Sequence, residues 1–145
     1  MKKLALIIAV ALMSMSCDND EPRVIDFNAL PKVSQEFVNT HFADKQISIV
    51  YLDKDFMDKD YEVIFTDGAN IDFNKNGEWT DVEDRDYNGV PDAIIPAKIL
   101  SFVKQKHPNN YIIEISKDRN EYDVELNNSL DITFDKSGNF RRYDD

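Results

Sequence analysis

The sequence is poor in the residues that build metal centres and covalent cross-links, with one cysteine and two histidines among 145 residues. So few thiol and imidazole groups exclude a zinc, haem or iron–sulfur site assembled from several of them. Basic residues are also in the minority: 17 Lys and Arg stand against 28 Asp and Glu, for a net charge of −11. Because such a chain repels phosphate backbones, the composition argues against nucleic-acid binding. The length fits one domain or two very small ones.

A long hydrophobic segment is missing too. The longest apolar run, Leu4 to Met13, is about half of the ~20 residues that a membrane-spanning helix needs. Met1-Lys2-Lys3 precedes this run, and the small residues Ser14 and Ser16 follow it. A positive start, a short apolar stretch and a small residue before the cut are typical of a secretory signal. We therefore assign residues 1–16 to a signal peptide.

The only cysteine, Cys17, directly follows that segment. The arrangement resembles a bacterial lipoprotein signal, in which the mature chain starts at a lipid-modified cysteine, although Ser14 stands where such signals usually carry Leu. The alternative is a plain secretory signal. The resemblance implies a lipidated N-terminus and tether over 17–27. It also implies a place in the envelope of a Gram-negative bacterium, periplasmic or surface-exposed, with the lipid as the only membrane contact.

The second half of the chain repeats the first. Tyr-Glu-Val at 61–63 returns as Tyr-Asp-Val at 122–124, and Ile-Asp-Phe at 71–73 returns as Ile-Thr-Phe at 132–134. Between 61–84 and 122–145, seven of the 24 aligned residues are identical, where composition alone gives roughly one or two. Upstream, Leu30-Pro31 matches Ile95-Pro96 at an offset of 65. We predict two units, 28–84 and 93–145, joined by an acidic linker over 85–92.

Each unit opens with a helix pattern. Pro31 and Pro96 suit the first helical position, where the missing N–H costs no hydrogen bond. The apolar residues that follow are spaced for one helical face; they are Val33, Phe37, Val38 and Phe42 in the first unit, and Ile99, Phe102 and Val103 in the second. Pro108 ends the second helix.

After each helix the apolar period changes from 3.6 to 2, which predicts strands. The alternating sets are Ile47, Ile49 and Tyr51, then Tyr61, Val63 and Phe65 in the first unit, with Tyr111, Ile113 and Ile115 at the start of the second. Asp67-Gly68 between alternating runs is typical of a hairpin turn, and Asn127-Asn128 is its counterpart. We predict an α+β fold of tandem α-β-β-β-β units, with an antiparallel sheet of up to eight strands and two helices packed on one face.

These features together resemble the PepSY-like family of secreted bacterial proteins, whose fold is similar to that of beta-lactamase inhibitor protein. The similarity rests on the Leu/Ile-Pro helix starts, the Tyr-x-Val and Ile-x-Phe strands, the Lys-x-Gly turns and Val90-Pro91 in the linker. It implies a domain that restrains a peptidase or another hydrolase by binding it against the sheet. No inhibitory motif can be transferred residue by residue, so this implication is an analogy of fold.

With helices on one face, the other sheet face is left to water or a partner. Residues that alternate with the inward set are candidates for partner binding; they are Glu62, Ile64, Asp123, Glu125 and Asp131, with Val50 or Leu52 beside Ile64. So acidic a face would attract a basic patch on another protein. The alternative is a solvated face that keeps the protein soluble.

The linker holds the sequence most typical of a metal site. Asp84, Asp86, Asn88 and Gly89 fit the first half of a calcium-binding loop, because calcium takes oxygen ligands at alternate positions around a sharp glycine turn. The final bidentate Glu is replaced by Ile95, and Asp92 substitutes for it only in part. The alternative is an acidic, solvated connection.

Catalytic patterns are not evident. His41 and His107 fall near the ends of the two predicted helices, and neither accompanies a nucleophile motif or a phosphate loop. We therefore predict a non-enzymatic envelope lipoprotein that binds a protein partner through the open sheet face. The alternative function is a calcium-dependent structural or ligand-binding protein centred on Asp84 to Asp92. No other cofactor is indicated.

Overall fold

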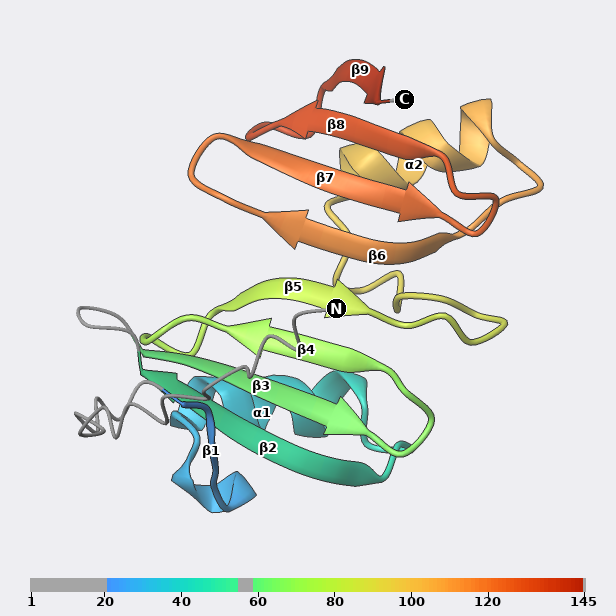
Figure 1. Ribbon diagram of the computed structural model, residues 1–145. Coiled ribbons are helices and arrows are strands. Elements are labelled where there is room, and N and C mark those ends of the chain that lie inside the picture. Colours follow the sequence, from blue (N-terminus) through green and yellow to red (C-terminus); the bar gives the residue numbers. More distant parts are fainter. Residues whose placement is uncertain (1–20, 55–58, 145) are drawn as a thin grey trace, which may run out of the picture.

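The computed structural model describes residues 21–54 and 59–144; the predicted signal peptide and Cys17 lie outside them. In the described residues, nine strands form one antiparallel sheet and pair in sequence order. Both helices lie behind this sheet on the same face, as Figure 1 shows. The α+β class is confirmed. The two half-sheets join directly, because β5 (Trp79–Glu83) pairs with β6 (Ile112–Lys117).

The order of one helix followed by four strands occurs twice. The N-terminal half contains α1 (Lys32–His41), β2 (Ile47–Lys54), β3 (Lys59–Phe65), β4 (Asn70–Phe73) and β5. The C-terminal half contains α2 (Ala97–Lys106), β6, β7 (Glu121–Leu126), β8 (Asp131–Asp135) and β9 (Phe140–Asp144). A two-residue strand, β1 (Arg23–Val24), and a short 3-10 helix, η1 (Phe27–Ala29), precede them.

The strand β1 makes the sheet one strand larger than predicted. It lies in the segment assigned to the tether, and Arg23 and Val24 pair with Leu52 and Tyr51 of β2. The N–H of Ile25 continues the ladder by donating to the carbonyl of Val50 at 2.9 Å, and the Ile25 side chain packs against the core. The prediction of at most eight strands is therefore wrong, since a two-residue strand leaves no alternating pattern in the sequence.

Each proline occupies the N-cap of its helix, one residue before the predicted place. The carbonyl of Pro31 accepts the first intrahelical bond from Gln35, and that of Pro96 accepts from Leu100. The helices bury Val38, Phe42, Ile99 and Val103 against the inner face of the sheet. This face carries the core, because Val63, Ile71 and Val82 and their counterparts in the C-terminal half point toward the helices.

The predicted alternation in β2 and β6 is wrong at one point in each strand. Ser48 is an extra residue opposite β3, so Ile47 and Val50 share the inner face while Ile49 and Tyr51 turn outward. Ile113 is the equivalent extra residue in β6. A β-bulge inserts one residue and reverses the side-chain sides beyond it. Val50 is accordingly buried, and Leu52, opposite inward-facing Tyr61, is no part of the outer face.

The hairpins between β3 and β4 and between β7 and β8 have the same geometry. In each, a three-residue turn is closed by one backbone bond, from the N–H of Phe65 to the carbonyl of Ala69 and from the N–H of Leu126 to the carbonyl of Leu130. The third turn residue has a positive φ, 94° at Gly68 and 64° at Ser129. The predicted turn at Asn127-Asn128 is thus correct in place, while Ser129 takes the left-handed conformation.

Candidate functional site: the outer sheet face and the linker

The outer face of the sheet carries two parallel rows of cross-strand neighbours that run from β2 to β9. The first row consists of Tyr51, Glu62, Asp72, Asp81, Ser116, Asp123, Thr133 and Arg142. The second row consists of Ile49, Ile64, Asn70, Glu83, Glu114, Glu125, Asp131 and Asp144. Residues directly opposite each other on neighbouring strands point to the same face.

Carboxylates form a diagonal band across these rows. In the N-terminal half they lie mainly in the first row, and in the C-terminal half mainly in the second. We call the nine carboxylates of the two rows the acidic face: Glu62, Asp72, Asp81, Glu83, Glu114, Asp123, Glu125, Asp131 and Asp144. The five residues predicted to bind a partner all lie on this side of the sheet, and Ile64 stands beside Ile49 at its apolar corner.

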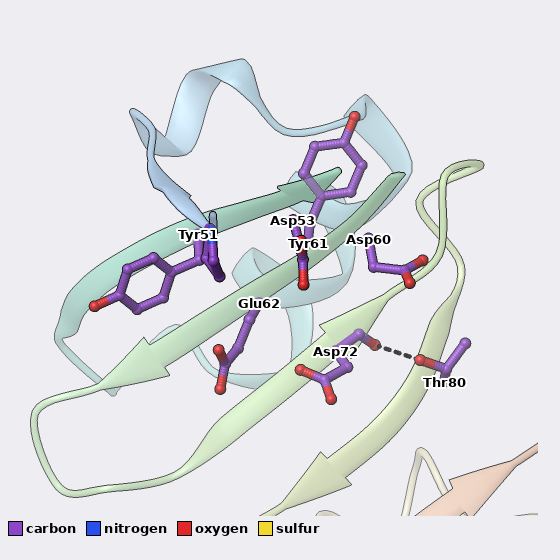
Figure 2. Close-up of a pocket in the computed structure, with 8 residues that line it drawn as sticks. Tyr51, Asp53, Asp60, Tyr61, Glu62, Asp72 and Thr80 are labelled. Atoms are coloured by element: carbon purple, nitrogen blue, oxygen red, sulfur yellow. Dashed lines mark hydrogen bonds between the residues drawn. The ribbon is translucent and has the colours of Figure 1, made fainter. Parts of the chain in front are cut away.

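A hollow of about 410 Å³ lies on the N-terminal part of this face. Figure 2 shows Tyr51, Glu62, Asp72 and Thr80 around it, each from a different strand. The hydroxyl of Thr80 donates to the Asp72 carbonyl at 3.3 Å. Asp53 and Asp60, from the ends of β2 and β3, complete an acidic wall. The hollow therefore combines an aromatic ring with several carboxylates, a combination suited to a cationic group.

A second, smaller hollow of about 250 Å³ lies on the C-terminal part of the face. Its lining includes Glu114, Asp123, Glu125, Asp131 and Asp144. The buried hydroxyl of Thr133 lies within hydrogen-bonding distance of the Asp123 and Asp144 carboxylates, at 2.7 Å from the first. Since a hydroxyl has one proton, it donates to one of these two acids at a time.

Burial and mutual repulsion make the central carboxyls hard to ionise. Burial, followed by the charges of Glu62 and Asp81, raises the pKa of Asp72 to about 6. Burial and neighbouring Glu83 raise the pKa of Asp81 to about 6. The pKa of Glu114 rises to about 7 because burial is reinforced by the surrounding acids. Like charges directly opposite each other destabilise a sheet, so this arrangement carries a cost in stability.

One guanidinium group compensates the middle of the acidic face. Arg85, which follows β5, pairs with Glu83 and approaches Glu125 at 3.2 Å and Glu114 at 3.5 Å. Hydrogen bonds to Glu125 and Glu83 raise the pKa of Arg85 further. Its side chain stays half exposed. Arg85 thereby shows how a guanidinium is held across three strands of this face.

Sequence reasoning missed Asp72, Asp81, Glu83, Glu114 and Arg85 as parts of this site. The alternation of Asp72 with the buried Ile71 and Phe73, and of Asp81 and Glu83 around buried Val82, was the available signal. What the sequence does not contain is the pairing of β5 with β6, which brings Glu83 opposite Glu114.

The linker residues predicted to bind calcium lie around one hollow of about 330 Å³. Asp84 is buried, and its carboxylate lies 3.0 Å from the ammonium of Lys45. Lys45 also pairs with Asp67, so it already supplies a cation in this place. Burial opposes the charge on Lys45, but its contacts with Asp67 and Asp84 raise its pKa overall.

The other predicted ligands have partners of their own. The Asp86 carboxylate accepts the N–H of Tyr87 at 2.8 Å, and Asp92 pairs with Lys104 of α2 at 2.7 Å. Asn88 lines the same hollow. Within 21–54 and 59–144, no three His, Cys, Asp or Glu side chains are arranged to hold a metal. A calcium ion at this place would therefore have to replace the present partners of Asp84, Asp86 and Asp92.

The histidines are engaged with aromatic side chains. His41 is the last residue of α1, and the centre of its ring lies 4.8 Å from the centre of the Phe37 ring. His107 caps the end of α2, and its Nε2 lies 3.1 Å from the hydroxyl of Tyr143.

None of the helices in the described ranges is long and apolar enough to cross a membrane.

The fold and the repeated turns agree with one protein family. The family described as "Putative beta-lactamase-inhibitor-like, PepSY-like" matches residues 59–142, which is more than half of the chain. The chain belongs to the PepSY-like family. No curated protein matches it.

Three solved structures from the genus Bacteroides are similar over almost their whole length. A "putative calcium-regulated periplasmic protein" from Bacteroides thetaiotaomicron is 35% identical with a TM-score of 0.83, covering 88% of this chain and 99% of that one. A "putative periplasmic protein" of the DUF2874 family from Bacteroides vulgatus is 36% identical with a TM-score of 0.81, covering 87% and 98%. A "putative periplasmic protein of unknown function", also from B. vulgatus, is 30% identical with a TM-score of 0.80, covering 86% and 100%.

Proposed function

We propose that the protein is a non-enzymatic envelope lipoprotein, acylated at Cys17, that binds a basic protein partner through the acidic face. We also infer that its two halves are tandem repeats, since their turns, bulges and helix starts recur at fixed offsets. The periplasmic descriptions of the related Bacteroides proteins support the envelope location.

The observation that carries the proposal is the row of acids facing one another at the centre of the sheet. Glu83 lies opposite Glu114, Glu114 opposite Glu125, and Glu125 opposite Asp131. Solubility alone is served by carboxylates spread over the surface, without direct opposition. Concentrating carboxylates in one band lowers the stability of the fold through their mutual repulsion. A bound cationic surface would remove this repulsion by neutralising the charges.

The geometry indicates the chemistry of the partner. Lys or Arg side chains fit the two acidic hollows, and the contacts of Arg85 with Glu83, Glu114 and Glu125 illustrate the binding mode. Ile49 and Ile64 offer an apolar contact at one corner. A basic surface with one apolar group at its edge is therefore the best match.

Inhibition of a hydrolase such as a beta-lactamase is the form of binding that the family description suggests, and the resemblance noted from the sequence extends it to a peptidase. Coverage of an enzyme by the acidic face would block its cleft sterically. Hydrolysis rates of envelope peptidases and of a beta-lactamase, measured with and without excess protein, test this extension. Unchanged rates throughout would confine the proposal to binding alone.

A lysine- and arginine-rich decapeptide serves as a defined probe for the face. We expect it to bind the intact protein, measured by calorimetry, and to bind at least tenfold more weakly to the double variant Glu62→Lys/Asp123→Lys. The matched control is Glu36→Lys/Asp118→Lys, which changes net charge equally but alters α1 and the β6–β7 turn. If both double variants lost the same affinity for the peptide, net charge alone would explain the binding, and the proposal would be overturned.

Ionic strength and pH sharpen the same experiment. Affinity should fall as salt rises from 50 to 300 mM, because the contacts are exposed and screened. It should also fall as pH drops from 8 to 5, since the carboxyls of Asp72, Asp81 and Glu114, with pKa values of about 6 to 7, take up protons. Pull-downs from an envelope extract, with Ile64→Asp as a further variant, then search for the natural partner.

Calcium binding by the linker is a second candidate. The related protein from B. thetaiotaomicron is described as a "putative calcium-regulated periplasmic protein", and Asp84, Asp86, Asn88 and Asp92 line one hollow. Calcium would have to displace the ammonium of Lys45 from Asp84. Titration calorimetry with calcium should give heat that Asp86→Ala abolishes; no heat in the unaltered protein would overturn this candidate.

A further inference from the structure

The two halves end in equivalent strands with different surroundings. Strand β5, the last of the N-terminal half, is paired along its outer edge with β6. Strand β9, the last of the C-terminal half, pairs with β8, and among the described residues no strand lies on its other edge. Figure 1 shows β9 at one end of the sheet.

The equivalence of β5 and β9 rests on their register. Trp79 lies opposite Phe73 and Val82 opposite Ile71, with the extra residue Thr80 between them. Phe140 lies opposite Phe134 and Tyr143 opposite Ile132, with Arg141 as the extra residue. Both strands therefore present the same backbone geometry to whatever lies beyond them.

The internal junction shows what such an edge accepts. Ile115 of β6 lies opposite Val82, which is fully buried. Two residues along β6, the ammonium of Lys117 lies 3.9 Å from the centre of the Trp79 ring. One strand thus covers the two inward side chains of β5 with an apolar residue and a basic one.

The corresponding side chains of β9 are uncovered. Tyr143, the counterpart of Val82, is 45% exposed, and Phe140, the counterpart of Trp79, is 40% exposed. They form an aromatic ledge with α2, in which Phe140 stacks on Phe102 at 4.9 Å and Tyr143 contacts His107. The ledge borders a hollow of about 450 Å³ between α2 and the β8–β9 turn.

The opposite end of the sheet is closed by the chain itself. The outer edge of β2, which corresponds to the edge of β6 that pairs with β5, is occupied by β1. Ile25, just beyond β1, packs into the core in the place that Val82 takes beside β6. Within the described ranges, β1 and β9 are the two terminal strands, and β9, with five residues against two, is the longer edge available for strand pairing.

We propose that the outer edge of β9, together with its aromatic ledge, is a docking site for an extended strand of a partner protein, which adds antiparallel to the sheet as β6 does on β5. This site shares Asp144 with the acidic face but does not depend on the function proposed for that face. Backbone hydrogen bonds supply the common part of such recognition, and alternate side chains supply specificity.

The internal junction and the charges of β9 define the pattern of the incoming strand. The residue opposite Tyr143 is apolar, like Ile115 opposite Val82. Two positions onward, a Lys or Arg lies over Phe140, as Lys117 lies over Trp79. On the outer side, a basic residue faces Asp144, which lies opposite like-charged Asp131 and pairs at 2.7 Å with Arg142 of its own strand. Four consecutive residues of the incoming strand are therefore basic, apolar, polar and basic, in the places that residues 114–117 take beside β5.

A peptide with the sequence of residues 109–119, which contains β6, is the natural probe, added to the intact protein. A second peptide carries Glu114→Lys, so that a basic residue faces Asp144. We expect amide hydrogen exchange of residues 141–144 to slow on binding, and the second peptide to bind at least fivefold more tightly than the first.

Variants separate strand addition from a loose aromatic contact. Phe140→Ala should weaken binding about tenfold, while Tyr87→Ala, which removes a 90% exposed ring from the linker, should leave it unchanged within twofold. Two peptides N-methylated at neighbouring residues should differ, because only alternate amides of an added strand face the sheet. The proposal predicts loss of binding for one of them.

Three results would overturn the proposal. One is unchanged exchange of 141–144 with either peptide, which would leave β9 as an ordinary charged edge. Another is equal binding of both N-methylated peptides, which would exclude backbone pairing. The third is a dimer in sedimentation velocity with 141–144 already protected, which would assign the edge to a second copy of the chain.

Discussion

The two halves share one backbone plan but bury it differently. In the N-terminal half, Trp79 and Val82 lie beneath the next strand, and Asp84 is held by Lys45 in a buried ion pair. In the C-terminal half, Phe140 and Tyr143 stay exposed, and the linker contact between Asp92 and Lys104 is solvated. The comparison teaches that equivalent positions in the two halves are covered in one and exposed in the other, because a neighbouring strand lies beside β5 and none of the described residues forms one beside β9.

The largest expected effect tests the two ion pairs. Lys45→Met should lower the free energy of unfolding by about 3 kcal/mol, because it leaves a charge on Asp84 buried without a partner. Lys104→Met should cost less than about 0.5 kcal/mol, since both members of its pair are about 60% exposed. Urea unfolding of both variants gives the comparison. Equal losses would show that the Asp84 site is as solvated as that of Asp92.

The equivalent aromatic positions come next. Trp79→Ala should cost about 3 kcal/mol, since the indole packs on Phe37 and beneath Lys117. Phe140→Ala should cost about 1 kcal/mol, because its ring is already 40% exposed. Thermal unfolding measures both. A larger loss for Phe140→Ala would mean that another part of the chain covers β9.

The third test concerns Glu114 at the junction of the two half-sheets. Unlike the substitutions above, its replacement should stabilise the protein. The pKa of Glu114 is about 7 in the folded protein, above its usual 4.5, so the folded state binds the proton more tightly than the unfolded chain. Stability should therefore fall as pH rises from about 4 to about 7. Glu114→Gln should stabilise by about 1 kcal/mol at pH 8, after allowance for solvent screening, and by nothing at pH 4.

The counterpart of Glu114 in the N-terminal half is Ile49, which has no charge to remove. Asp118→Asn is a better control, because the N–H groups of Asn120 and Glu121 lower the pKa of Asp118. That variant should destabilise at pH 8. A Glu114→Gln variant without any pH dependence would contradict the repulsion described for the acidic face.

The smallest effect compares the two equivalent turns. Ser129→Gly should stabilise by roughly 0.5–1 kcal/mol, because serine at a φ of 64° bears the steric cost of the left-handed region. Gly68→Ala should destabilise the protein by about 1 kcal/mol, because alanine would have to adopt the left-handed φ of 94°. A clash does not contribute, since a Cβ at this position meets no neighbouring atom. Chemical unfolding of both variants measures the difference. If both substitutions changed the free energy of unfolding in the same direction, the two turns would not share one backbone requirement.

Local chemistry made much of the fold predictable. The turns at Asn74–Gly77 and Asp135–Gly138 follow from side-chain oxygens that accept backbone N–H groups two and four residues on. The helix starts follow from two prolines and an apolar face. The inward alternation of β3 also holds, because Val63 and Phe65 are buried.

What sequence reasoning missed depends on pairing between distant segments. The bulges at Ser48 and Ile113 carry no glycine to mark them, and their register exists only against β3 and β7. The bond between Lys45 and Asp84 joins residues far apart in the chain. For the site, the acids of β3 and β7 were predicted. Asp72 and Asp81 were missed although they alternate with buried residues, and only the position of Glu114 opposite Glu83 required the joined sheet.

The strand order, which follows the chain from β1 to β9, has a kinetic consequence. Most pairings close hairpins of a few residues, so their loop-closure entropy is small and they should form early. Two pairings, β1 with β2 and β5 with β6, must wait for a helix to fold between their members. We expect the second to complete folding, with each half collapsing before the sheet becomes continuous.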